Sequence, residues 1–230
     1  MEAVTSSLLG VGIYTVQEAS RLTGVSVGRI RRWLRGYNFR TKGKRHHSPR
    51  LWEGQHKPID HAQALGFLDL IEIKFVDAFL SNGVSWVTLR KARERARELF
   101  GETHPFCSQR FATDGHEIFV ELQQTGEPIL LEIARNQEVF VDIVKPFFKE
   151  LEFDKDHSLV LWRPATQRRL VVLDPSRNFG RPIVARRGIP TEALAQAAKA
   201  SGSVAEVSRW YEVSEDEIKD AVEFEQKLAA

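Results

Sequence analysis

Residues 14–36 have the sequence YTVQEASRLTGVSVGRIRRWLRG. Thr15 and, three residues later, Glu18 form a capping box, which starts a helix by satisfying its first backbone N–H groups. Gly24 supplies the left-handed residue that ends a helix, and Ser26 is a side-chain cap for a second one. This stretch therefore predicts two short helices joined by a tight turn.

Apolar and basic residues lie on different faces of these helices. The apolar set recurs at helical spacing and predicts a buried face; it comprises Val16, Ala19, Leu22, Ile30, Trp33 and Leu34. Two helices joined by a glycine-containing turn form the helix-turn-helix unit, whose second helix enters the major groove, where arginines reach guanine edges or phosphates. A solvated basic helix in a small helical domain is the alternative. The residues of this unit predicted to contact DNA are Thr15, Ser26, Arg29, Arg31, Arg32 and Arg35.

Basic residues continue beyond the second helix, in a stretch with glycine, proline and little helical period. Residues 1–57 hold 11 Lys/Arg and 3 Asp/Glu, a net charge of +8, although the whole chain carries only +2. Such a stretch predicts a wing or arm along the phosphate backbone of DNA. The histidines at 46 and 47 lack a third ligand at metal-site spacing, so no metal is expected. The wing residues predicted to contact DNA are Arg40, Lys42, Lys44, Arg45 and Arg50.

Residues 14–36 and the basic wing together resemble the winged helix-turn-helix of MerR-type regulators. Such regulators continue into two further helices, and residues 59–82 and 85–101 fit them. Three arginines on one face of the second of these either contact phosphate or are simply solvated; they are Arg90, Arg93 and Arg97. The long dimerising coiled coil and the inducer-binding cysteines of the metal-sensing members are absent, which argues against metal sensing.

Residues 105–173 are predicted to form a small α+β module that joins or dimerises the two ends of the chain. Asp114-Gly115 is a hairpin-turn signal within a β-like stretch from Arg110 to Gln123. Further expected elements are a turn at 125–128, a strand at 129–133, a helix from 137 to 151 interrupted near Pro146, and strands at 159–162 and 169–173. The single cysteine, Cys107, is expected to be an inert packed residue.

Residues 174–230 predict a bundle of three short helices. Thr191 begins the first and Gly202 ends it, while capping boxes at Ser203 and Ser214 begin the second and third. Trp210 is expected to be buried with the valines of the second helix. Residues 192–230 hold 4 Lys/Arg and 9 Asp/Glu. Because an acidic surface repels phosphate, this bundle is better suited to a protein partner than to DNA.

A second resemblance lies in the loop before this bundle. Asp174-Pro175, Gly180-Arg181-Pro182-Ile183-Val184 and Ile189-Pro190, followed by three helices, resemble the small C-terminal domain of formerly unknown function that many bacterial antitoxins contain. The glycine-threonine-arginine usual in that family is Arg186-Arg187-Gly188 here. Over nearly all 230 residues the chain is similar to VapB-type antitoxins that join a MerR-like DNA-binding domain to this module.

This resemblance implies an antitoxin of a type II toxin–antitoxin system. Its partner is then a PIN-like ribonuclease, whose acidic residues hold magnesium, and the antitoxin blocks that enzyme and represses their shared promoter. We hypothesise that an arginine of the loop enters the toxin's carboxylate site; an ordinary solvated loop is the alternative. The residues predicted to bind toxin are Arg177, Phe179, Arg181, Arg186, Arg187, Trp210 and Tyr211.

The sequence thus predicts an α+β fold: residues 1–104 with a MerR-like winged helix-turn-helix, 105–173 with the central β-containing module, and 174–230 with the C-terminal three-helix bundle. A homodimer is expected, because a single small DNA-binding domain rarely binds DNA tightly enough. Residues 66–100 and the central module are both candidate dimer interfaces. A stand-alone MerR-like regulator whose C-terminal part senses a small molecule is the alternative function.

An enzyme is not expected. The segment from Gly36 to Lys44 lacks the spacing and the hydroxyl of a phosphate-binding loop, and no other catalytic motif occurs, so no catalytic residue or cofactor is assigned. A single cysteine, the absence of a signal-like start and short apolar runs predict a cytoplasmic location without membrane insertion.

Overall fold

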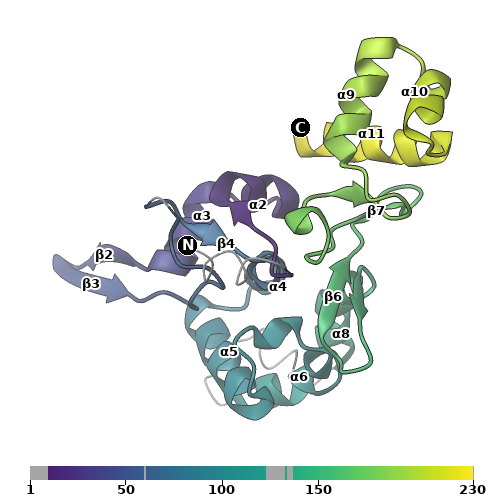
Figure 1. Ribbon diagram of the computed structural model, residues 1–230. Helices are drawn as coiled ribbons and strands as arrows, with labels where there is room; N and C mark the ends of the chain where they lie inside the picture. Colours follow the sequence, from purple (N-terminus) through teal and green to yellow (C-terminus); the bar gives the residue numbers. More distant parts are fainter. Residues whose placement is uncertain (1–9, 60, 123–132, 134–136, 230) are drawn as a thin grey trace, which may run out of the picture. The chain divides into compact units, whose positions relative to one another are not determined.

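A computed structural model describes residues 10–59, 61–122, 133 and 137–229 of the chain. They form two compact units (Figure 1). Of the described residues, the first unit comprises those within Tyr14–Lys149 and Lys155–Leu159, and the second comprises those of 10–13, Glu150–Asp154 and 160–229. No described helix is long and apolar enough to cross a membrane.

The first unit is mainly helical. Its elements are β1 (Tyr14–Thr15), α2 (Val16–Thr23), α3 (Val27–Arg35), β2 (Tyr37–Thr41), β3 (Lys44–Ser48), β4 (Ala64–Leu65), α4 (Phe67–Ser81), α5 (Trp86–Phe100), the short 3-10 helix η1 (Pro105–Cys107), α6 (Gln109–Leu122) and α8 (Gln137–Phe148). Helix α4 is central and packs against α2, α5, η1 and α8. Most residues of α4 are buried, so apolar residues occur around most of its circumference rather than on one face.

An aromatic cluster fills the core between α4 and the helices that follow it. Phe79 of α4 stacks on Phe119 of α6 with ring centroids 5.0 Å apart, and Phe106 and Phe111 approach to 4.7 Å. Phe140 of α8 lies within 5.7 Å of Phe119. These rings bury large apolar surfaces in stacked and tilted contacts, and Phe79 also meets Phe111 edge to face.

The two N-terminal helices form as the sequence predicts. The Thr15 hydroxyl accepts a hydrogen bond from the Glu18 backbone N–H at 3.1 Å, and the Glu18 carboxylate accepts one from the Thr15 backbone N–H at 2.7 Å. Gly24 ends α2 in the left-handed conformation, with φ 76°. The Ser26 hydroxyl accepts from the backbone N–H of the third residue of α3. Both caps and the turn are therefore confirmed.

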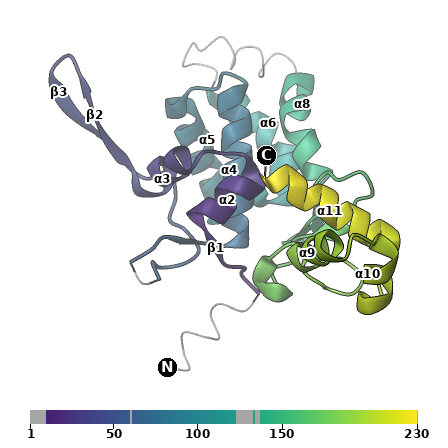
Figure 2. The same ribbon diagram turned by 90° about the horizontal axis from the view of Figure 1, so that it is seen from above.

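The basic stretch after α3 forms a hairpin of β2 and β3, which extends outward from α3 (Figures 1 and 2). The strands pair antiparallel, with Phe39 opposite His46 and Arg40 opposite Arg45. Lys42 and Gly43 form the turn with φ values of 50° and 78°. Two positive φ values are typical of the tight turns that match the twist of a hairpin.

The helix predicted at residues 59–82 begins later than expected. Residues 64 and 65 are instead β4, which pairs antiparallel with β1, and α4 starts at Phe67. Leu65 lies opposite Tyr14, and both side chains are buried. Strand pairing with a distant segment therefore overrides the local helical pattern at this point. The helix predicted at 85–101 is confirmed as α5, with Ser85 as its cap and Gly101 as its end.

The β hairpin predicted between Arg110 and Gln123 is wrong, because residues 109–122 form helix α6. Its buried residues are Phe111, Gly115, Ile118 and Phe119, which recur at helical spacing and face the aromatic core. Gly115 is a helix-packing residue rather than a turn residue. A Cβ there would lie 2.7 Å from the ring of Phe140, so only glycine allows this close approach.

The boundary between the two units falls within the predicted module at residues 105–173. Of the described residues, those between 105 and 149 belong to the first unit, and most of the strands that follow belong to the second. The predicted turn at 125–128 and most of the strand at 129–133 lie outside the described residues, and Ile133 itself is helical and buried. Helix α8 contains Pro146 and ends at Phe148.

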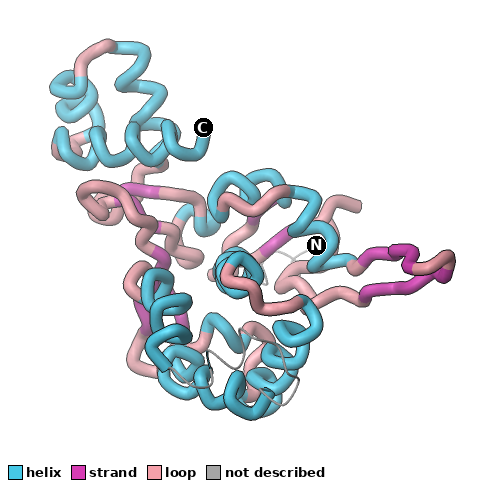
Figure 3. The backbone as a smooth tube through the Cα atoms, turned by 180° about the vertical axis from the view of Figure 1, so that it is seen from behind, coloured by secondary structure: helices cyan, strands magenta, loops and turns pink. Residues whose placement is uncertain are grey.

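The second unit joins two small sheets to a helical bundle. Its elements are β5 (Leu151–Phe153), β6 (Leu159–Trp162), β7 (Val171–Val172), the 3-10 helix η3 (Asn178–Gly180), β8 (Ile183–Val184), α9 (Thr191–Ser201), α10 (Val204–Tyr211) and α11 (Glu215–Ala229). Strand β5 pairs with β6, and β7 pairs with β8 (Figure 3). The predicted strands near 159–162 and 169–173 are confirmed, the latter shortened to two residues.

The three predicted C-terminal helices are confirmed. Ser214 and Glu217 form the expected capping box of α11. Leu194, Val207 and Ile218, one from each helix, meet in the core of the bundle. The loop between β6 and β7 is tied to the bundle by Asp220, a buried carboxylate of α11 that accepts hydrogen bonds from the Thr166 hydroxyl and from the backbone N–H groups of residues 168 and 170.

Candidate nucleic-acid interface and protein-binding loop

Helix α3 presents the arginines that the sequence assigns to DNA on its exposed side. Its buried residues are Ile30, Trp33 and Leu34, as predicted. Arg31 and Arg32 are exposed. Arg35, also exposed, donates a hydrogen bond from Nε to the side-chain oxygen of Gln63 at 2.9 Å. The helix therefore separates an apolar face from a basic one.

The hairpin tip concentrates positive charge. Arg40, Lys42, Lys44 and Arg45 are all exposed. Arg40 and Arg45 are directly opposite each other in the strand pair, an arrangement in which like charges destabilise a hairpin. An anionic ligand such as the phosphate backbone would remove this repulsion. The tip thus has the charge of a polyanion-binding arm.

An aromatic pair lies on the other face of the hairpin. The rings of Phe39 and His46 stack with centroids 5.3 Å apart, and Tyr37 approaches Phe39 to 5.7 Å. The Phe39 side chain remains 42% exposed. These contacts stiffen the hairpin by cross-strand packing.

Helix α5 anchors the base of the hairpin. Arg90 donates hydrogen bonds to the backbone carbonyls of Pro49 and Arg50 at 2.7 and 2.9 Å. Trp86 donates from its indole nitrogen to the Ser48 hydroxyl at 3.3 Å. Arg90 is therefore not simply solvated, and phosphate contact by Arg90 stays a prediction. Arg90 positions the hairpin, and Arg50 itself is exposed beside Glu53.

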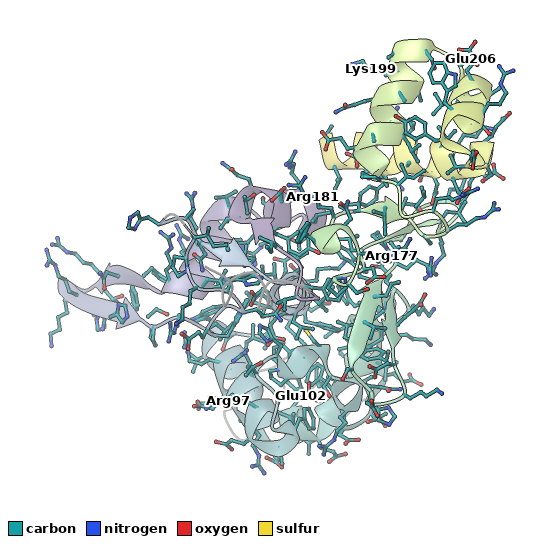
Figure 4. The ribbon with its side chains drawn as sticks, viewed as in Figure 1. Arg97, Glu102, Arg177, Arg181, Lys199 and Glu206 are labelled. Atoms are coloured by element: carbon teal, nitrogen blue, oxygen red, sulfur yellow. The ribbon has the colours of Figure 1, made fainter. Side chains whose placement is uncertain are left out.

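Arg93 is a buried structural residue, which corrects both expectations for it. Its Nε lies 2.7 Å from a Glu72 carboxylate oxygen, and neither side chain is more than 7% exposed. Its guanidinium also donates to the backbone carbonyls of Leu51 and Thr103. Burying a charge in this way requires a partner. Of the three arginines, Arg97 remains exposed (Figure 4).

Asp69 is the centre of a second buried polar cluster, which the sequence did not predict. Its carboxylate accepts hydrogen bonds from the indole of Trp52 at 2.7 Å, the backbone N–H groups of Gln55 and Gly66 at 2.9 and 2.8 Å, and His104 Nε2 at 2.8 Å. Burial acts to raise the pKa of Asp69, but the hydrogen bond and charge of His104 and the two backbone N–H groups outweigh it and lower this pKa. The cluster fixes the segment after the hairpin onto α4.

Cys107 lies beside this cluster and is packed, as expected. Its thiol contacts the Leu68 carbonyl and the Glu72 carboxylate. Burial first, and then the charge of Glu72, raise the pKa of Cys107 well above its usual value. The group is therefore held as a thiol rather than as the nucleophilic thiolate. Within the described residues, no three His, Cys, Asp or Glu side chains come together as metal ligands.

Gly36 is the residue at which a single methyl group should disturb the hairpin. Its φ is +74°, and a Cβ there would lie 2.5 Å from the Ser48 carbonyl oxygen. We expect Gly36→Ala to lower the free energy of unfolding by about 1–3 kcal/mol, since the left-handed backbone and the clash both oppose alanine. Thermal denaturation of the two proteins measures the difference. Gly28→Ala is the control, because the space beside Gly28 is open; an equal loss in both would contradict the explanation.

The loop before the C-terminal bundle does not present its four arginines equally. Arg177 donates to the Ala185 carbonyl at 2.8 Å, and its guanidinium lies where a side chain at position 188 would otherwise be. It therefore holds the loop together. Arg187 pairs with Glu212 at 3.1 Å. Arg181 and Arg186 are exposed, and Figure 4 labels Arg177 and Arg181 on this loop.

Of the predicted toxin-binding aromatics, two are exposed. Phe179 is 53% exposed and has a left-handed backbone, with φ 54°. Trp210 is 63% exposed, so its predicted burial is wrong. Val204, Val207 and Tyr211 take the inward positions of α10 instead. Exposed tryptophan is uncommon on a surface without a partner, because its ring buries a large apolar area on contact.

Comparisons with known proteins find a matching family model, a protein of similar sequence and a solved structure of similar fold. A family model described as "Protein of unknown function (DUF433)" matches residues 171–224, which span β7 to most of α11. A protein named Putative antitoxin VapB45, from Mycobacterium tuberculosis strain H37Rv, is 28% identical in a 225-residue alignment that covers 93% of this chain and 93% of that protein. Along nearly its whole length, the chain is thus similar to an antitoxin-like protein of VapB type.

A solved structure shares the fold. The crystal structure of Rv2018 from Mycobacterium tuberculosis matches with a TM-score of 0.70 at 21% identity, and the match covers 93% of this chain and 99% of that one. The fold of nearly the whole chain is therefore shared with another protein.

Proposed function

We propose that this protein is the antitoxin of a type II toxin–antitoxin system, which neutralises a PIN-like ribonuclease and represses its own promoter. The similarity to a protein named as a VapB antitoxin over 93% of both chains carries this proposal. The name of this relative supports the assignment to a toxin–antitoxin system. The ribonuclease and the promoter rest on the resemblance of the sequence to VapB-type antitoxins.

The first unit is the proposed DNA-binding part. Its two capped helices, the exposed arginines of α3 and the cationic hairpin tip support a MerR-like winged helix-turn-helix. The second helix would enter the major groove while Arg40 and Arg45 contact phosphate. The anchoring of the hairpin by Arg90 supports this arrangement, because it holds the hairpin at a defined place beside α3. We propose that a homodimer binds two half-sites.

The second unit is the proposed toxin-binding part. The exposed arginines of the loop favour an acidic partner surface, and the exposed ring of Trp210 favours a protein partner. Arg177 is no longer a candidate for entering the toxin, since its guanidinium bonds within the loop. Arg181, Arg186 and Arg187 are the better candidates, because their side chains are exposed.

Co-expression with the neighbouring gene tests the proposal. A tag on this chain alone should recover a small second protein, and that protein should stop growth when it is expressed without this chain. The purified pair should also bind the DNA segment directly upstream of the two genes. Recovery of no second protein, together with a harmless neighbour, would remove the antitoxin function.

Trp210→Ala should weaken the complex with that second protein. A buried tryptophan at an interface contributes about 2 kcal/mol or more, so the dissociation constant should rise about 30-fold. Isothermal titration calorimetry measures the change. Val160→Ala is the matched control, because it truncates another exposed apolar side chain of the same unit. If both variants bind like the parent protein, α10 does not contact the partner.

A further inference from the structure

Arg29 of α3 is held by a carboxylate of its own unit. Its Nη1 lies 2.6 Å from Oδ1 of Asp77 on α4. Its guanidinium also lies over the ring of Trp33, 5.0 Å from the centroid. Of the arginines that the sequence assigns to the major groove, this one therefore has an internal anionic partner that competes with DNA.

The ion pair is open to exchange. The side chains of Arg29 and Asp77 are 41% and 30% exposed. Partly exposed ion pairs contribute less to stability than fully buried ones, so replacing the partner of Asp77 costs less than it would in the core, although Asp77 Oδ1 itself is buried. A phosphate oxygen or a guanine edge is a comparable partner for a guanidinium. Arg29 can consequently leave Asp77 when DNA offers it a well-placed acceptor.

The surroundings of Asp77 can accommodate its carboxylate after Arg29 has left. Asp77 lines a pocket of about 320 Å³ between α4, α8 and the end of α2. Lys74, one helical turn earlier on α4, lines the same pocket. Water can enter a pocket of this size, and the Lys74 ammonium supplies a compensating charge. The carboxylate would therefore not be left buried and unpaired.

We propose that Asp77 is a specificity-determining residue of the DNA-binding unit. It retains Arg29 on DNA that offers only randomly placed phosphates, and it releases Arg29 where the operator presents an acceptor in register. Asp77 thereby lowers non-specific affinity more than operator affinity. This inference rests on the proposed DNA-binding function, and it adds a residue outside the basic face that sets the ratio between the two affinities.

Asp77→Asn tests this role. Fluorescence anisotropy over a series of salt concentrations is measured with two probes: a random-sequence duplex and the duplex directly upstream of the protein's own coding sequence. We expect affinity for the random duplex to rise about fivefold at physiological salt and the log–log salt slope to steepen by about 0.9, as one added phosphate contact requires. Affinity for the upstream duplex should change less.

Two further variants make the result specific. Asp142→Asn removes the same charge from the same pocket, and it should leave both affinities unchanged. Arg29→Ala in the Asp77→Asn background should abolish the gain on random DNA. An Asp77→Asn variant that loses affinity as Arg29→Ala does would overturn the proposal, since Asp77 would then orient Arg29 for DNA. Equal gains in Asp77→Asn and Asp142→Asn would overturn it as well.

Failure of this inference is distinguishable from failure of the proposed function. If the unchanged protein binds neither duplex at any salt concentration, DNA binding itself is wrong. If it binds the upstream duplex preferentially and Asp77→Asn keeps the same ratio of affinities, only the role of Asp77 is wrong.

Discussion

Replacing Asp69 with alanine should lower the free energy of unfolding of the first unit by about 3–5 kcal/mol, the cost of removing one member of a buried charged cluster. Four donors meet this carboxylate: the indole of Trp52, the imidazole of His104 and the backbone N–H groups of Gln55 and Gly66. Alanine leaves all four without an acceptor in a place that water does not reach. The free energy of unfolding of Asp69→Asn should lie between those of the parent protein and Asp69→Ala. Asparagine keeps one acceptor oxygen, but its amide group brings further donors to a site that already has four.

The same cluster predicts how stability depends on pH. The pKa of Asp69 is lower in the folded protein than its usual value. Its contribution is therefore fully present above the unfolded-state pKa, about 3.9, and is lost as the pH falls through the folded-state pKa. Asp69→Asn should flatten the acid side of the stability profile, while the profile near neutral pH only shifts downward.

Hydrogen exchange followed by mass spectrometry measures these effects unit by unit. Peptides from α4 should exchange much faster in the Asp69 variants, whereas peptides from α9 to α11 should not change and serve as an internal reference. Asp142→Asn removes an exposed charge from the same unit and should change stability by less than about 0.5 kcal/mol. Protection of α4 that is unchanged in Asp69→Asn would show that the cluster is not a stabilising centre.

The sequence predicts those parts of the fold whose signals are local. The caps at Thr15, Ser26 and Ser214 each involve a partner three residues away, so a short sequence pattern contains the whole interaction. The faces of α3 follow in the same way from the 3.6-residue period. The basic hairpin also has a local signal, because its charge and its turn residues are adjacent in the chain.

The parts that the sequence misses depend on distant partners. Ile118-Phe119-Val120 favours a strand locally, yet packing of Phe111 and Phe119 against the aromatic core makes this segment helical. The hydrogen bond from His104 to Asp69 spans 35 residues, and the pair of Arg29 with Asp77 joins α3 to α4. Carboxylates at 69, 72 and 77 in a helix whose remaining residues, apart from Lys74 and Ser81, are apolar were the available signal for these clusters.

Removing three cations from the hairpin tip should weaken DNA binding about 100-fold at physiological salt. The variant is Arg40→Gln with Lys44→Gln and Arg45→Gln, which keeps Lys42 at its positive φ. Each lost phosphate contact reduces the log–log salt slope by about 0.9, so the slope should become shallower by about 2.7. Anisotropy with the upstream duplex over a salt series measures both quantities.

Stability should change in the opposite direction from affinity in this variant. Arg40 and Arg45 face each other across the strand pair, so their replacement removes a like-charge repulsion and should leave the melting temperature unchanged or slightly higher. Loss of affinity through misfolding would instead lower the melting temperature. A control that replaces Lys91, Lys145 and Lys149 with glutamine removes the same charge from on and beside α5 and α8, where all three are exposed. If this control loses as much affinity and slope as the hairpin variant, net charge rather than a docked hairpin accounts for DNA binding.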